Sequence, residues 1–286
     1  SYYHGHNEDS GSRREQAEQA DTIVQVRDVD MTYKTGTHGV RKVLDRFSME
    51  VMRGEILGLV GKSGCGKSTL LKAFTRILPT KAGSITLDGQ SIALLPTKEV
   101  AQKFALLPQT MEATDGITVY DLVSYGRFPH QTGLGRLSTE DREKICWAME
   151  ATQVSEFSDW QVDDLSGGQR QRVWIAMALA QDTETIFLDE PTTYLDMNHQ
   201  LEILELLNDL NRLSGKTIIM VLHDINLAAR FSHQLIAMKN GRIRYQGSVE
   251  QVMTSDILRD IFQIEAQIIR DPIQDKPLCL SYQLVK

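Results

Sequence analysis

The strongest constraint on this 286-residue chain is a glycine-rich segment that begins at Gly61. It fits the pattern G-x-x-x-x-G-K-[ST] and lies between an apolar run at residues 55–60 and a helical pattern at residues 69–78. A strand that turns tightly into a helix presents backbone N–H groups and the positive helix end to an anion. We therefore predict a phosphate-binding loop. Its residues are Gly61, Lys62, Ser63, Gly64, Cys65, Gly66, Lys67, Ser68 and Thr69.

Two side chains of this loop have the chemistry that a nucleotide triphosphate requires. We expect Lys67 to reach the β- and γ-phosphates of ATP and the Ser68 hydroxyl to bind Mg²⁺. Cys65 is interpreted as a small filler of the loop rather than as a reactive thiol. The alternative is a glycine-rich turn that happens to carry a surface lysine.

Composition and charge exclude several classes of protein. Hydrophobic residues make up 41% of the chain, which is enough for a large core, and the net charge of -7 gives no overall basic field for nucleic acid. No apolar stretch reaches the roughly 18 residues of a membrane-spanning helix. The polar residues 1–22 are expected to form a flexible tail. The three widely spaced cysteines predict free thiols in a reducing cytosol rather than disulfides or a zinc site.

The remaining pattern predicts an α/β fold, because strand-like apolar runs alternate with helical segments. The predicted strands are residues 23–29, 43–51, 55–60, 84–87, 104–107, 185–189, 217–222 and 235–238. Helical patterns dominate from about 118 to 181, and a further helix is expected at 198–213. From about residue 247 we predict two short helices and a proline-containing tail. One domain is expected over 23–262, with a helical subdomain at about 112–181 and a C-terminal tail at 263–286.

Two carboxylates follow the apolar run at residues 186–188. Because ligands bind beyond the carboxyl ends of parallel strands, Asp189 and Glu190 are expected to meet the phosphate-binding loop. We predict that Asp189 holds Mg²⁺ through water and that Glu190 acts as the general base for the attacking water. His223 ends another predicted strand and is a candidate for contacting the γ-phosphate or positioning the water. Taken alone, the carboxylates fit an acidic turn equally well, and a lone histidine is more often structural.

The segment Leu165-Ser166-Gly167-Gly168-Gln169 resembles the LSGGQ signature of ABC ATPases, and it lies between the phosphate loop and the acidic strand as in that family. Ser166, Gly167, Gly168 and Gln169 place a hydroxyl and bare backbone donors at a helix start, which makes a second anion site. The resemblance implies that this site binds the ATP held by a partner subunit. Two ATP molecules would then lie in a head-to-tail homodimer or pseudo-dimer.

Further motifs carry the resemblance to other positions. Tyr33 matches the aromatic residue that stacks on adenine, although a tyrosine at a strand end would also explain it. Gln109 matches the glutamine that contacts Mg²⁺ and the water and that links to the transmembrane partner, Asp196 matches the loop that crosses the dimer interface, and His223 matches the switch histidine. The implied fold is a P-loop NTPase core with a mostly parallel sheet, an N-terminal antiparallel β subdomain and an α-helical signature subdomain.

A narrower resemblance is to the ATPases of iron-chelate importers. Residues 126–131, 191–196 and 222–230 and the late Asp271-Pro272 are similar to that group, whereas residues 61–64 read Gly-Lys-Ser-Gly where the group more often has Gly-Pro-Asn-Gly. The resemblance implies an ATP- and Mg²⁺-dependent subunit at the cytoplasmic face of the membrane. Its partners would be permease subunits and, indirectly, a substrate-binding protein, with iron–siderophore import as the expected function.

Three alternatives accompany this prediction. The cargo could instead be haem, cobalamin or another chelate. A soluble ABC ATPase that acts on DNA or ribosomes is a second alternative, but the chain has no long coiled-coil insertion, no zinc cysteines and a single cassette. The third is a module that grips ATP without hydrolysing it, and the presence of both Glu190 and His223 argues against it.

Overall fold

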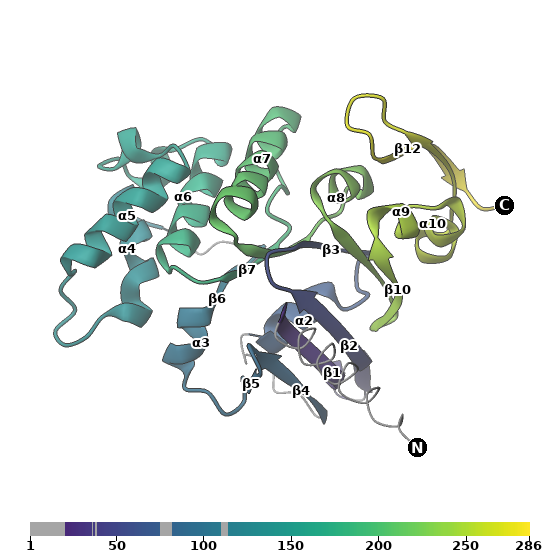
Figure 1. Cartoon of the computed structure of the whole chain (residues 1–286), viewed down its shortest axis with the longest axis horizontal. Coiled ribbons are helices and arrows are strands. Elements are labelled where there is room, and N and C mark those ends of the chain that lie inside the picture. Colours follow the sequence, from purple (N-terminus) through teal and green to yellow (C-terminus); the bar gives the residue numbers. More distant parts are fainter. Residues whose placement is uncertain (1–20, 36, 38, 75–81, 110–113) are drawn as a thin grey trace, which may run out of the picture.

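The computed structural model describes residues 21–35, 37, 39–74, 82–109 and 114–286 (Figure 1). Its centre is a six-stranded sheet with the strand order β10-β9-β3-β8-β7-β6. Five of these strands are parallel neighbours, and only β10 runs antiparallel to its neighbour. The strands are β3 (Ile56–Gly61), β6 (Phe104–Leu107), β7 (Thr185–Asp189), β8 (Thr217–Val221), β9 (Gln234–Lys239) and β10 (Arg242–Ser248). The predicted mostly parallel sheet is confirmed, although β10 was not predicted.

A second, antiparallel sheet packs against the first. Its order is β2-β1-β4-β5, formed by β1 (Thr22–Thr35), β2 (Gly39–Met52), β4 (Ala82–Leu87) and β5 (Gln90–Ser91). Helix α2 (Lys67–Phe74) packs in the core that this sheet shares with the central one. There Phe74 stacks on Phe104 with ring centroids 5.1 Å apart and also contacts Phe187. The predicted N-terminal antiparallel β subdomain is therefore present.

A helical region projects from the β6–β7 edge of the central sheet (Figure 1). It comprises α4 (Val119–Ser124), η1 (Tyr125–His130), α5 (Thr139–Ala151), η2 (Ser155–Phe157), η3 (Val162–Asp164) and α6 (Gly167–Ala180). Capping boxes begin two of the helices, with Ser138 before α5 and Ser166 before α6. Helix α3 (Thr97–Lys103) lies beside η1, since Gln102 Nε2 donates to the Pro129 carbonyl at 2.8 Å. The predicted helical region at 118–181 is confirmed, while its proposed domain boundaries remain predictions.

A buried ion pair fixes η1 within this region. Arg127 Nε lies 2.8 Å from Asp141 Oδ1, and the two side chains are 3% and 5% exposed. Arg127 also donates to the carbonyl of Ala180 at 2.8 Å, while Asp141 accepts from the backbone N–H of Ser138 at 2.9 Å. The pair therefore joins η1 to the start of α5 and the end of α6.

The C-terminal part corrects the sequence prediction. After α7 (Met197–Ser214), α8 (Ile225–Phe231), α9 (Val249–Val252) and α10 (Ser255–Phe262), the expected tail is instead a β-hairpin of β11 (Ile264–Arg270) and β12 (Pro277–Leu284). Alternate residues of β11, namely Ile264, Ala266 and Ile268, pack against the core. The Asp271 carboxylate accepts from two backbone N–H groups of the turn. Burial on one face and a hydrogen-bonded turn explain why these residues form a hairpin.

Two simpler expectations concern single features. Among the described residues, no helix is both long and apolar enough to cross a membrane. Cys65, Cys146 and Cys279 are all free, as expected. The predicted tail at residues 1–22 lies almost entirely outside the described residues.

Candidate nucleotide-binding and catalytic site

The predicted phosphate-binding loop lies between β3 and α2, at the carboxyl end of the central strand. Gly64 and Gly66 have φ values of 79° and 109°, which side-chain-bearing residues rarely adopt. A Cβ at Gly66 would also lie 2.9 Å from the carbonyl oxygen of Val43. The loop therefore needs glycine at residue 64 for conformation and at residue 66 for space as well.

Lys67 is buried beneath this loop. Its ammonium donates to the carbonyl of Gly61 and, at 3.1 Å, to that of Lys62. Within the described part of the chain, no carboxylate forms an ion pair with it. A buried ammonium without a carboxylate in contact is suited to an anionic ligand, because a phosphate supplies the missing opposite charge.

Asp189 ends the buried strand β7 beside the loop. Its Oδ2 accepts from Ser68 Oγ at 3.2 Å, while its buried Oδ1 has no hydrogen-bond partner. Burial raises the pKa of Asp189, and the neighbouring Glu190 charge adds to this effect. A hydroxyl and a buried, unsatisfied carboxylate oxygen are hard ligands that suit Mg²⁺, so these residues fit the predicted metal.

Glu190 and His223 are in direct contact at one side of the site. Glu190 Oε1 lies 2.7 Å from His223 Nε2, and Glu190 Oε2 accepts from Thr193 Oγ1 at 3.2 Å. The Glu190 side chain is 6% exposed and that of His223 is 52% exposed. The Glu190 backbone has φ 53° and donates its N–H to the Val221 carbonyl at 2.9 Å. The strained backbone therefore fixes a carboxylate against β8 and toward the histidine.

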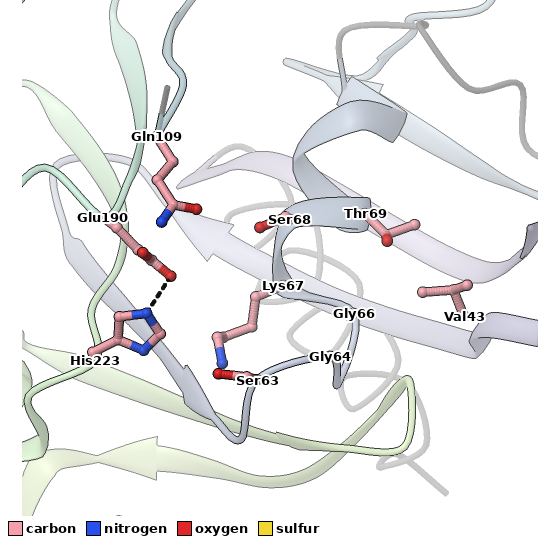
Figure 2. Close-up of a pocket in the computed structure, with 10 residues that line it drawn as sticks. All are labelled: Val43, Ser63, Gly64, Gly66, Lys67, Ser68, Thr69, Gln109, Glu190 and His223. Atoms are coloured by element: carbon pink, nitrogen blue, oxygen red, sulfur yellow. Dashed lines mark ion pairs between the residues drawn. The ribbon is translucent and has the colours of Figure 1, made fainter. Parts of the chain in front are cut away.

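These side chains surround one cavity of about 470 Å³ (Figure 2). The carboxylate, the histidine and Gln109 project toward the cavity from one side, and the phosphate loop bounds it from the other. The lining residues are Val43, Ser63, Gly64, Gly66, Lys67, Ser68, Thr69, Gln109, Glu190 and His223. Sequence reasoning missed Val43, because nothing in its strand pattern indicates that β2 passes beside α2. The backbone of Tyr33 lies in β1 opposite Arg41, and its side chain is not among the side chains that the structure describes.

The signature residues lie outside this cavity. Ser166 caps α6, and its hydroxyl accepts from the Gln169 N–H at 3.3 Å while the Gln169 side chain accepts from the Ser166 N–H at 3.1 Å. Ser166 and Gly167 are exposed, whereas Gly168 is buried, with His199 so near that an added Cβ would lie 3.0 Å from its ring. The helix start is therefore exposed at Ser166 and Gly167 and lies away from the nucleotide cavity of its own chain.

The loop before α7 also projects into solvent. Asp196 precedes α7 and makes no capping hydrogen bond with its side chain. It is flanked by Tyr194 and Met197, which are 93% and 83% exposed. The sequence did not indicate the exposure of Tyr194 and Met197.

Comparison with known proteins agrees with this geometry. The family model described as ABC transporter matches residues 44–193, from β2 through the acidic strand end. This chain belongs to the ABC transporter family. The ABC ATPase is 54% identical to the iron(3+)-hydroxamate import ATP-binding protein FhuC of Bacillus subtilis, over 87% of this chain and 93% of the relative. It is 43% identical to the ferric enterobactin transport ATP-binding protein FepC of Escherichia coli, over 84% and 89% of the two chains.

A solved structure supports the same assignment. The dimeric structure of MJ0796, a bacterial ABC transporter cassette, matches with a TM-score of 0.70 and 29% identity, over 79% of this chain and 99% of the cassette. The predicted fold class and the predicted ATP-hydrolysing, transport-coupled activity are thereby confirmed. The ABC ATPase binds ATP, and its individual site residues and its metal remain predictions.

Proposed function

We propose that this ABC ATPase powers the import of ferric siderophores, and that it does so as one of two cassettes that close head to tail on ATP. The observation that most directly supports ATP hydrolysis at this site is the distance of 2.7 Å between Glu190 Oε1 and His223 Nε2 at the edge of the phosphate-loop cavity. A carboxylate at the cavity edge, next to a group that can position water, distinguishes a hydrolase from a protein that only binds nucleotide.

Binding would begin at the phosphate loop. The loop amides and the start of α2 would surround the phosphates, and Lys67 would exchange its bonds to the Gly61 and Lys62 carbonyls for bonds to phosphate oxygens. Val43 would provide an apolar wall, and Tyr33 is our candidate for stacking on adenine. Ser68, Asp189 and Gln109 would hold Mg²⁺, which neutralises charge that develops on the phosphates.

Hydrolysis would use the groups on the opposite side of the cavity. Glu190 would accept a proton from water as the water oxygen bonds to the γ-phosphorus and the bond to the β–γ bridging oxygen breaks. ADP and inorganic phosphate result. His223 would position the water and contact the γ-phosphate, and Gln109 projects toward the same space (Figure 2).

The second half of the nucleotide site would come from a partner cassette. The capped start of α6 leaves Ser166 and Gly167 exposed, so that their donors can reach the γ-phosphate of ATP bound to the other copy. Tyr194, Asp196 and Met197 form an exposed ridge that fits the same interface. This arrangement explains why one chain has two anion sites and only one nucleotide cavity.

The permease would dock at the helical region, at the cytoplasmic face of the membrane. Tyr125 and Phe128 in η1 are exposed and in contact, with ring centroids 5.0 Å apart. Helix α3 packs beside η1 and leads into β6, which ends just before Gln109. A membrane subunit that binds this aromatic pair would therefore be connected to Gln109, the candidate nucleotide contact, through α3 and β6.

The siderophore cargo is inferred from relatives whose names specify iron(3+)-hydroxamate import, petrobactin import and ferric enterobactin transport. Haem, cobalamin and other chelates are the neighbouring alternatives. The experiment is to purify the ATPase with its permease and a substrate-binding protein in lipid, and to measure turnover with each ligand. Stimulation by a ferric siderophore supports the proposal, and stimulation only by haem or cobalamin contradicts the cargo.

The catalytic assignment is tested by Glu190→Gln. We expect turnover to fall by about 100-fold or more while ATP binding and ATP-dependent dimer formation persist, because only proton acceptance is lost. Glu143→Gln, an exposed change on α5, is the matched control and should leave turnover unchanged. Normal turnover in Glu190→Gln would remove Glu190 from its catalytic role.

A further inference from the structure

The C-terminal hairpin is attached to α8, the helix that follows the candidate switch histidine. Asn226 in the first turn of α8 exchanges two hydrogen bonds with the backbone of Cys279 in β12. Its Nδ2 donates to the Cys279 carbonyl at 3.0 Å, and its Oδ1 accepts from the Cys279 N–H at 2.8 Å. The side-chain amide thus pairs with β12 as a peptide group of a neighbouring strand would. The start of α8 is therefore tied to the hairpin.

The other end of α8 is tied to the hairpin as well. Lys276 Nζ donates to the carbonyls of Ala229, Arg230 and Ser232 at 3.2, 2.8 and 3.1 Å. The last carbonyls of a helix have no partner within the helix, and a cation there also interacts favourably with the negative end of the helix dipole. Lys276 directly precedes β12, so the hairpin holds α8 at both ends.

His223 depends on α8 for its position. It lies in the short connection between β8 and α8, three residues before Asn226. The next residue, Asp224, caps α8 by accepting from the N–H groups of Asn226 and Leu227 at 2.9 and 3.0 Å. The His223 ring itself is half-exposed, so packing does little to fix it. A shift of α8 would therefore move His223 relative to Glu190.

The base of the hairpin contacts the opposite side of the nucleotide site. Lys62 of the phosphate loop donates to the side chain of Gln263 at 2.5 Å, and Gln263 directly precedes β11. Lys62 is also one of the positions where this chain departs from the usual Gly-Pro-Asn-Gly. The same C-terminal unit thus contacts the phosphate loop and α8, the helix that follows the candidate switch histidine.

We propose that the β11–β12 hairpin is a brace that positions His223 for hydrolysis, with Asn226 and Lys276 as its positioning residues. Neither residue lines the nucleotide cavity. They act through α8, whose placement sets the distance from His223 to the γ-phosphate and the attacking water. This inference rests on the proposed role of His223 in hydrolysis.

The test measures ATP turnover of the full chain for Asn226→Ala and Lys276→Met. We expect kcat to fall about 10- to 100-fold, the effect of misplacing a reacting group by an ångström or less, while KM and the nucleotide Kd change less than about twofold. Lys276→Arg keeps the donors and should retain most of the activity. Ser281→Ala, an exposed change in the same strand, is the matched control and should be neutral.

A double-mutant cycle separates positioning from general damage. In a His223→Ala background, Asn226→Ala should cause no further loss of kcat, because the group that it positions is absent. The brace alone is overturned if Asn226→Ala lowers kcat equally in both backgrounds. It is also overturned if Asn226→Ala and Lys276→Met leave kcat unchanged while His223→Ala is impaired. Unchanged kcat in His223→Ala would overturn the proposed role of His223, and the brace with it.

Discussion

Replacing Asp141 by asparagine tests how the helical region holds its shape. The change removes a carboxylate that is 5% exposed and that accepts from Arg127 Nε at 2.8 Å and from the Ser138 N–H at 2.9 Å. Arg127 would keep the Ala180 carbonyl as an acceptor but would lose the carboxylate that balances its charge. Because the guanidinium is 3% exposed, water cannot replace the lost carboxylate.

The expected cost follows from these contacts. Breaking a buried ion pair by removing one partner destabilises a protein by about 3–5 kcal/mol. The capping box at Ser138 is also weakened, a loss that by itself would cost about 1 kcal/mol. Because both losses involve the same carboxylate they are not additive, and we expect a decrease of about 4 kcal/mol in the free energy of unfolding of the helical region.

Urea unfolding followed by tryptophan fluorescence measures this quantity directly. All three tryptophans of the chain, Trp147, Trp160 and Trp174, lie in the helical region. Asp121→Asn is the matched control, since Asp121 occupies the same position of a capped first turn but is exposed. It should cost less than about 0.5 kcal/mol.

The stability of a double variant and the pH dependence of stability test the same ion pair. The double variant Arg127→Met with Asp141→Asn should be more stable than Asp141→Asn alone, because no unpaired guanidinium remains buried. Burial by itself would raise the pKa of Asp141, but hydrogen bonds from Ser138 and Arg127 hold that pKa below its ordinary value. The stabilisation is therefore present above about pH 4 and is lost as the pH falls through the lowered pKa. If the free energy of unfolding of Asp141→Asn lay within about 1 kcal/mol of that of the natural chain, the buried pair would not hold the helical region together.

Two other predictions concern the nucleotide site. Gly168→Ala places a Cβ 3.0 Å from the His199 ring, so we expect about tenfold lower turnover at unchanged nucleotide affinity. Adding His199→Ala should restore part of that turnover, and equal turnover in the single and double variants would argue against the clash. Asp189→Asn should weaken binding of MgATP but not of ATP in EDTA, as measured by titration with each form. Because burial raises the pKa of Asp189, MgATP affinity of the natural chain should decline as the pH falls through that raised value, and an equal loss in EDTA would exclude the metal role.

The sequence predicted those parts of the site that consist of consecutive residues. The phosphate loop, the pair of carboxylates after β7 and the capped start of α6 each occupy a few adjacent positions. Their backbone geometry follows from glycine conformations, strand ends and capping residues. The order of these motifs indicated the family, and the family model and the relatives confirmed it. The buried strands β3, β7 and β8 were also predictable, because each is a short and continuous apolar run.

Contacts between distant residues were not predictable in the same way. Residues 263–286 were expected to form a tail, yet β11 and β12 form a hairpin that Asn226 and Lys276 attach to α8. Likewise, Val43 joins the nucleotide cavity and His199 fills the space beside Gly168.

By itself, the sequence determined which chemical groups this ATPase has and the local turns that present them, since those depend on neighbouring residues. Only the tertiary structure decided which groups face one another. The contact between Glu190 and His223, the buried pair of Arg127 and Asp141, and the attachment of the hairpin to α8 each join segments from different elements. Such contacts are set by how strands and helices pack, and no local pattern of residues encodes that packing.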